Sequence, residues 1–297
     1  MVYIRNKNVK GVKYAYLVKS EWDSIKNTSK QKTIKYLGKT SELTLDHIPF
    51  EYREVPTVLN FILNNNKLTN VVNFNQNMKN KIYDLLMECN IDELLLAYKK
   101  YSNSFSLEDF YDYILKPIMY QIGYLWETGK IDIATEHAIT NTVNKLIKLI
   151  TPNVDYENNY STNFKRVAIL TVDGELHNTA CNIIESLLIN LKFFVYNLSP
   201  SIPLESIIRY IEKENPDILM LSITLPDHIN KINRLLKTIN EKKPSLKIVI
   251  GGQSSHLLNL NMNQHNNILI KSNITFNEFT IMMKNICRNN SKNKKSS

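Results

Sequence analysis

The chain has 297 residues, enough for about two to three domains with ample core. It is basic, with a net charge of +9 at pH 7. Its three cysteines, Cys89, Cys181 and Cys287, lie far apart and form no C-x-x-C pair, which argues for a reducing compartment and against a disulfide framework or a zinc site.

The sequence gives no indication of a membrane segment. Its apolar runs fall short of the ~18 residues that a membrane-spanning helix needs. The first residues, M-V-Y-I-R-N-K, lack the apolar core of a signal peptide. We therefore expect a cytoplasmic protein that does not bind membranes.

Residues 1–45 are predicted to form a small basic module rich in β-strands. Within residues 1–40, ten Lys or Arg stand against two acidic residues. The alternating pattern predicts strands at Tyr3–Arg5, Tyr14–Val18 and Thr33–Leu37. Tyrosines interleave with the charges, a composition that suits phosphate contact and base stacking, so we expect residues 1–40 to bind DNA. The alternatives are a solvated charged surface and a core built from those tyrosines, which are Tyr3, Tyr14, Tyr16 and Tyr36.

Residues 46–77 are predicted to be a linker with short helices. Thr44–Ile48 and Val55–Asn64 are the helical candidates, with Pro49 and Pro56 as breakers. The Asn-rich run that follows, up to Asn80, predicts a flexible or poorly packed segment.

Residues 78–151 carry a helical pattern throughout. The first two helices are separated near Asn90, Ser106 caps the third, and Asp132 caps the fourth, with Pro117 as a kink inside the third. Four helices with short connections predict an up-and-down four-helix bundle.

One corner of this bundle brings together chemically useful side chains. Trp126 ends the third helix, and Glu136-His137 begin the fourth. Together, an aromatic ring, a carboxylate and an imidazole at one end of a bundle can cover an apolar group and hydrogen-bond a ribose and a base. The plainer alternative is a buried Trp beside a Glu that the helix dipole favours.

Residues 152–163 are predicted to be a linker, and residues 164–288 alternate strands and helices. This alternation predicts a Rossmann-like domain, a doubly wound parallel sheet of flavodoxin-like order. The last residues, 289–297, are polar and basic, and we expect them to be a disordered tail.

The first strand of this domain leads into a candidate metal ligand. Val167–Val172 is a continuous apolar run that stops at the turn Asp173-Gly174. Glu175 and His177 follow, at the carboxyl end of the strand, where open α/β sheets bind ligands. An imidazole near a carboxylate is a suitable metal ligand.

The stretch Glu175 to Ala180, E-L-H-N-T-A, resembles the E/D-x-H-x-x-G motif of cobalamin-binding domains, with Ala180 where the family has Gly. Polar and glycine residues after two later strands match the family in the same order, at Ser222, Thr224, Gly251 and Gly252. The resemblance implies that His177 is the lower axial ligand of cobalt and that the other four lie beside the cofactor's nucleotide tail. The remaining histidines have no ligand spacing and receive no role, namely His47, His228, His256 and His265.

The stretch from Leu115 to His137 resembles the cap of CarH-type photoreceptor regulators. In that family W-x9-E-H contacts the upper adenosyl group, which implies this role for Trp126, Glu136 and His137. Glu127 stands where the family has a histidine, so a photoproduct with two imidazole ligands is not expected. The usual MerR-type winged helix is missing from residues 1–60.

The leading hypothesis is therefore an adenosylcobalamin-dependent, light-responsive transcriptional regulator that is not an enzyme, binds DNA and forms a homo-oligomer. The alternative is a corrinoid carrier protein that holds methylcobalamin and serves a partner methyltransferase. A third possibility is a regulator that senses cobalamin without light.

Overall fold

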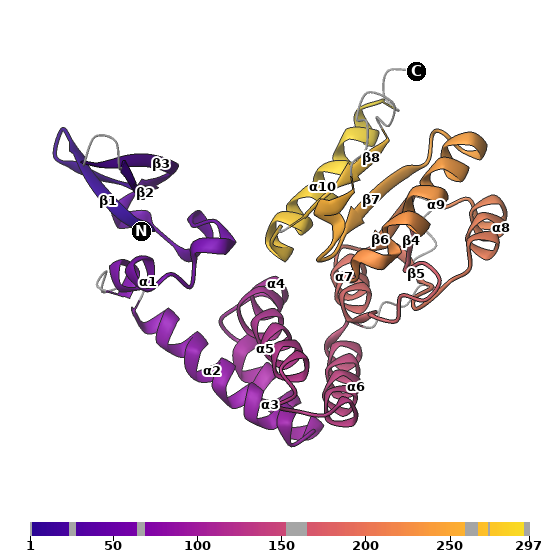
Figure 1. The fold of residues 1–297 in the computed structure, drawn as a ribbon, viewed down its shortest axis with the longest axis horizontal. Helices are drawn as coiled ribbons and strands as arrows, with labels where there is room; N and C mark the ends of the chain where they lie inside the picture. Colours follow the sequence, from indigo (N-terminus) through magenta and orange to yellow (C-terminus); the bar gives the residue numbers. More distant parts are fainter. Residues whose placement is uncertain are drawn as a thin grey trace. The chain divides into compact units, whose positions relative to one another are not determined.

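The structure is a computed structural model that describes residues 2–23, 28–63, 69–152, 165–258, 267–272 and 274–293. Two compact units divide the chain, Met1–Met78 and Lys79–Ser297. Each is described by itself (Figure 1). No helix in the described part of the chain is long and apolar enough to cross a membrane.

The N-terminal unit is built on a three-stranded antiparallel sheet in the order β1-β2-β3. The three predicted strands are confirmed, and each is longer than its apolar core suggested. A two-residue turn, Lys10-Gly11, joins the first two strands, with positive φ at both positions. The elements of the unit are β1 (Val2–Val9), β2 (Val12–Asp23), β3 (Thr28–Lys39), the 3₁₀ turns η1 (Thr40–Glu42), η2 (Leu45–His47) and η3 (Phe50–Tyr52), and α1 (Pro56–Leu63).

The core of this unit is aliphatic. It joins one face of the sheet to residues from the segment predicted to be a linker, and its buried members are Ile4, Ala15, Leu17, Leu37, Leu43, Ile48, Val58 and Ile62. The prediction of a linker from residue 46 is therefore wrong, because a three-stranded sheet needs a second layer to bury its apolar face. The alternative that Tyr3, Tyr14, Tyr16 and Tyr36 form this core is also wrong, because none of the four belongs to it.

The helical cap contains the four predicted helices. Ser106 and Asp132 accept the expected capping bonds from the amides of Asp109 and Thr135, and Asn90, where the first two helices separate, accepts one from the amide of Glu93. Its first helix begins at Thr69, inside the stretch predicted to be flexible, while Asn64–Asn66 lie outside the described residues. The cap comprises α2 (Thr69–Met87), α3 (Ile91–Ser102), α4 (Leu107–Phe110), the π-turn η4 (Tyr111–Leu115), α5 (Lys116–Glu127) and α6 (Ile133–Ile150).

Pro117 lies inside the third helix as predicted, where the hydrogen-bond pattern of the helix changes. It lies in the first turn of α5, directly after the π-turn η4. Proline has no amide hydrogen to donate to the preceding turn, and a wider turn accommodates its ring.

The C-terminal domain is a five-stranded parallel sheet in the order β5-β4-β6-β7-β8, the predicted flavodoxin-like arrangement. Its strands and helices alternate along the chain and the helices surround the sheet (Figure 1). The elements are β4 (Arg166–Leu170), α7 (Thr179–Asn190), β5 (Phe194–Asn197), α8 (Leu204–Glu214), β6 (Ile218–Ser222), η5 (Pro226–His228), α9 (Ile229–Lys242), β7 (Lys247–Gly251), η6 (Ser255–Leu257), β8 (Ile268–Ile270) and α10 (Phe276–Asn293).

Two segments at the ends of this domain were predicted to lack regular structure, a linker before it and a tail after it. The helix α10 continues to Asn293, so the tail predicted to be disordered from residue 289 is helical for most of its length. No Gly or Pro follows Cys287 to end the helix. The predicted linker falls almost wholly on residues 153–164, which lie outside the described residues.

Buried polar contacts join the cap to the sheet domain. Tyr111 of the π-turn donates from its hydroxyl to Ser186 Oγ of α7 at 2.9 Å. The carboxylate of Asp112, 1% exposed, accepts from the amides of Phe276 and Asn277 at 2.9 and 3.2 Å. Phe276 and Asn277 are the first two residues of α10. Asp112 of the helical cap therefore provides the acceptor at the N-terminus of a helix in the sheet domain.

Candidate cobalamin site

The candidate site begins where β4 ends. The turn at Asp173-Gly174 uses a positive φ of 84° at Gly174 and turns the chain so that Glu175 points inward. The Glu175 side chain is 1% exposed, while that of His177 is 53% exposed. Thr171 is also buried, and its hydroxyl donates to the Glu175 carbonyl at 2.8 Å, which holds the loop against the end of β4.

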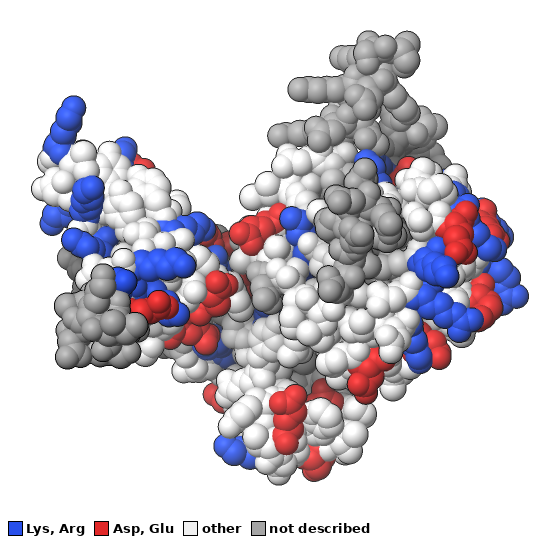
Figure 2. Space-filling view, turned by 45° about the horizontal axis from the view of Figure 1, so that its top comes forward, with Lys and Arg blue, Asp and Glu red and all other residues white. Residues whose placement is uncertain are grey.

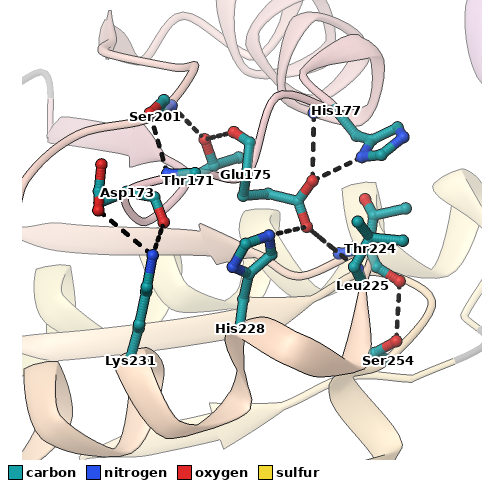
Figure 3. Close-up of polar contacts among 11 residues, drawn as sticks. Thr171, Asp173, Glu175, His177, Ser201, Thr224, Leu225, His228, Lys231 and Ser254 are labelled. Atoms are coloured by element: carbon teal, nitrogen blue, oxygen red, sulfur yellow. Dashed lines mark hydrogen bonds and ion pairs between the residues drawn. The ribbon is translucent and has the colours of Figure 1, made fainter.

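The Glu175 carboxylate connects two loops (Figure 3). Its Oε1 accepts from the amide of His177 at 3.2 Å and lies 2.6 Å from Nδ1 of the same residue. Its Oε2 accepts from the amides of Thr224 and Leu225, at 3.0 and 3.1 Å, in the loop after β6. Four hydrogen bonds thus hold one carboxylate between the loops that follow β4 and β6.

These contacts set the protonation states. Burial alone would raise the pKa of Glu175, but the hydrogen bonds from His177, Leu225 and Thr224 prevail and lower it to about 2. The hydrogen bond to Glu175 also raises the pKa of His177. An ionised carboxylate only accepts, so the neutral ring carries its proton on Nδ1 and keeps a free lone pair on Nε2. In Figure 3 this second nitrogen lies on the side of the ring away from Glu175.

The structure adds two residues that the sequence analysis left without a role. His228 is only 9% exposed and lies behind Glu175, with its Nε2 3.9 Å from Oε2. It therefore belongs to the surroundings of Glu175, although it was assigned no role from its spacing in the sequence. Lys231 donates to the carbonyl and carboxylate oxygens of Asp173 at 2.6 and 3.2 Å. Both residues follow β6, the strand that carries Ser222. This position in the sequence could have indicated that they lie near the site.

A second group of polar atoms lies buried beside the sheet. The Ser222 hydroxyl has no nitrogen or oxygen hydrogen-bond partner among the described residues, although Ser222 is only 5% exposed, and it lies next to the Cys181 thiol, a weak hydrogen-bonding group. The Cys181 thiol of α7 is buried near Ser222 and Ser199, and burial raises its pKa to about 11. Ala180, next to it in the first turn of α7, is partly exposed. Ser222 ends β6, the position that the resemblance assigns to the nucleotide tail.

Thr224, Gly251 and Gly252 also reach this edge of the sheet. Thr224 contributes its backbone, since its amide donates to Glu175 and its carbonyl accepts from Ser254. Gly252 has φ of +99°, and a Cβ there would overlap the backbone of Ile223. Its lack of a side chain is therefore required by this chain's own backbone, before any cofactor is considered. A Cβ at Gly251 would make an ordinary 3.7 Å contact with the carbonyl of Lys271.

The cap motif is partly assembled. Glu136 accepts from Thr140 at 2.6 Å and lies 2.7 Å from Nδ1 of His137. Its charge also helps to raise the pKa of His177, so the first turn of α6 and the His177 loop share one electrostatic neighbourhood. Trp126 is 44% exposed, and among the described residues no hydrogen bond or ring contact connects it to Glu136 or His137.

Two matches to known families cover this unit. Residues 165–266 match a B12 binding domain, and residues 78–151 match a second, helical B12 binding domain. The chain is a B12-binding domain protein with a helical cap. Its cofactor is cobalamin or a related corrinoid, and both matches begin after the N-terminal sheet.

The curated relatives are corrinoid proteins. Dimethylamine corrinoid protein 2 of Methanosarcina acetivorans is 19% identical over 177 residues, 58% of this chain and 80% of the relative. Trimethylamine corrinoid protein of Methanosarcina barkeri is 23% identical over 138 residues, 45% of this chain and 63% of the relative. The structure of Methanosarcina barkeri monomethylamine corrinoid protein superposes with a TM-score of 0.53 at 17% identity, over 67% of this chain and 94% of that one, which shows a common fold.

The residues present fit a corrinoid. His177 offers an exposed imidazole whose Nδ1 is already held, the arrangement in which protein histidines bind metals. Ser222 offers a buried hydroxyl without a nitrogen or oxygen partner among the described residues, which a polar ligand group can satisfy.

Proposed function

We propose that the chain is a corrinoid carrier protein that passes a methyl group between partner methyltransferases. The observation that carries this proposal is the order of a helical cap and a B12 binding domain, shared with relatives named as methylamine corrinoid proteins. The carrier is not itself the catalyst, and its partner is a methyltransferase that acts on a small methylated amine.

In this proposal His177 would hold the cobalt through Nε2, and Glu175 would position its ring. The carboxylate fixes the ring through Nδ1 and increases the basicity of Nε2. The amides of Thr224 and Leu225 hold the carboxylate in turn, so the ligand depends on a rigid sheet edge. When bound, the corrin supplies a cobalt centre that accepts and releases the methyl group. An imidazolium at His177 with Nε2 protonated would be stabilised by the ionised Glu175.

The light-responsive regulator is the second candidate. Exposed Trp126 at the same end of the bundle as the Glu136–His137 pair favours it, because a bare aromatic ring there can cover an adenosyl group. The curated relatives favour the carrier instead, since their names describe methylamine corrinoid proteins. Light sensing and homo-oligomer formation remain predictions.

Reconstitution separates the two. The protein is loaded with methylcobalamin or with adenosylcobalamin in the dark, and the visible spectrum and gel-filtration volume are recorded before and after green light. The carrier proposal predicts an unchanged elution volume with either cofactor. It also predicts that the reduced, loaded protein regains the methylcobalamin spectrum when given mono-, di- or trimethylamine with the matching purified methyltransferase.

A Trp126→Ala variant sharpens this comparison. For a carrier, the variant binds both cofactor forms with similar affinity to the parent. Selective loss of adenosylcobalamin binding, together with a light-dependent change in elution volume and no methylation by any of the three enzyme systems, would refute the carrier and support the regulator.

A further inference from the structure

One face of the N-terminal sheet has no covering layer among the described residues of its unit. The buried core lies on the face of Ile4, Ala15 and Leu17. Side chains alternate along a strand, so Tyr14 and Tyr16 of β2 point to the opposite face. Strand register assigns their neighbours to that same face, since cross-strand partners share a side. These partners are Arg5 and Tyr36 for Tyr16, and Lys7 and Lys39 for Tyr14.

Three tyrosines form a cluster on this outer face. The ring centroids of Tyr14 and Tyr36 are 6.2 Å apart, and those of Tyr16 and Tyr36 are 5.1 Å apart. Tyr36 is 52% exposed, a large exposed area for an aromatic residue in so small a unit. The aliphatic core does not include them, so packing within the unit leaves their exposure unexplained.

Positive charge surrounds the cluster. Arg5 and Lys7 are exposed on β1, and the exposed Lys39 on β3 is the cross-strand partner of Tyr14. Arg5 donates to the neutral Gln31 at 2.7 Å, which orients the guanidinium and leaves its charge uncompensated by that contact. Glu42 pairs with Lys39 at 3.1 Å at one edge of the face. Figure 2 shows Lys and Arg spread widely over the surface of the N-terminal unit.

Flat aromatic rings next to fixed cations suit one class of ligand. Bases stack on exposed rings, and phosphates bind the flanking Arg and Lys. A duplex presents its phosphates but hides the faces of its bases, so it makes no use of Tyr36. We infer that the outer face of the β1-β2-β3 sheet binds single-stranded nucleic acid, with bases on Tyr36 and Tyr16 and phosphates at Arg5 and Lys7. This inference stands apart from the corrinoid proposal.

Fluorescence anisotropy of the full chain tests it. The probes are labelled single strands of thymidine or uridine, about 20 nucleotides long to exceed known binding-site sizes. A duplex of the same length and vesicles of anionic lipid serve as competitors. The variants are Tyr36→Ala, Tyr36→Phe and Lys7→Glu. Matched controls are Tyr124→Ala, an equally exposed tyrosine of the cap (57%), and Lys237→Glu, an exposed lysine of α9.

The inference predicts single-strand binding that weakens as salt rises. Tyr36→Ala should reduce affinity about tenfold while Tyr36→Phe retains it, because stacking needs the ring and not the hydroxyl. Lys7→Glu should weaken binding and flatten the salt dependence, and neither control should change it. Preference between the thymidine and uridine strands tells DNA from RNA. No single-strand binding, a preference for duplex or vesicles, or equal losses in the controls would overturn the inference.

Discussion

Nδ1 of His177 lies 2.6 Å from Oε1 of Glu175, so a carboxylate that is 1% exposed fixes an imidazole that is half exposed. The same carboxylate accepts two amides from the loop after β6. The orientation of the proposed cobalt ligand therefore depends on the alignment of two neighbouring strands, and not on the loop that carries it alone.

Replacing the carboxylate should weaken cofactor binding. Glu175→Gln keeps the size of the side chain but removes the charge that holds Nδ1–H, and a lost partner of a metal-binding histidine typically costs about 10–100-fold in affinity. Titration of the apo-protein with methylcobalamin, followed in the visible spectrum, measures this loss. Glu205→Gln, an exposed acid in the first turn of α8, is the matched control and should bind as the parent does. Equal affinity in the two variants would remove Glu175 from the site.

The same pair predicts a pH dependence of stability. The folded pKa of Glu175, about 2, lies below its ordinary value of 4.5. The stabilisation from its ionised form is therefore complete above pH 4.5 and is lost as the pH falls from there towards about 2. The difference in free energy of unfolding between the parent and Glu175→Gln should shrink over this acidic range. Urea unfolding of the two proteins at several pH values checks it, and a difference independent of pH would count against the assignment.

Gly252 should not tolerate a side chain. Gly252→Ala places a Cβ against the backbone of Ile223 at a φ of +99°, and the strain should cost about 1–3 kcal/mol or more of stability. Gly123→Ala in α5 is the control, because a Cβ there meets nothing within 4 Å and alanine favours a helix. Thermal unfolding should show a lower midpoint for the first variant and an unchanged or higher one for the second. The reverse order would mean that the loops after β6 and β7 are not this close.

The buried hydroxyl of Ser222 should matter only to a cofactor with a nucleotide tail. Ser222→Ala removes a hydroxyl that has no nitrogen or oxygen partner among the described residues and only the weakly bonding Cys181 thiol beside it, so the stability of the apo-protein should hold or rise. Cobalamin affinity should fall about two- to tenfold, the value of one hydrogen bond. Cobinamide lacks the tail and provides the control. If cobinamide binding falls equally, the hydroxyl does not face the tail.

Much of the sheet domain follows from its sequence. The β-branched run Val167–Val172 can be buried on both sides only in a parallel sheet, and strands that alternate with helices leave few possible orders. The positions of Glu175 and His177 follow too, because both lie directly after the first strand.

The remaining features depend on long-range contacts. His228 is 53 positions from Glu175 in sequence, and only the pairing of β4 with β6 brings them together. The second layer of the N-terminal sheet was predicted to be a linker. Ile48 lies well before the helix that carries Val58 and Ile62, and only packing against the sheet brings the three into one core. Asp112 caps α10 across 164 positions, which no local pattern indicates.

The coordinate bond from His177 to cobalt is tested most directly by electron paramagnetic resonance of the protein loaded with cobalamin and reduced to Co(II). The unpaired electron couples to the axial nitrogen, so the number of splitting lines identifies the isotope of that atom. With ¹⁵N introduced only into histidine and an unlabelled cofactor, the account predicts doublet splitting that is absent in His177→Ala. Triplet splitting from the ¹⁴N of the cofactor's own base would contradict it.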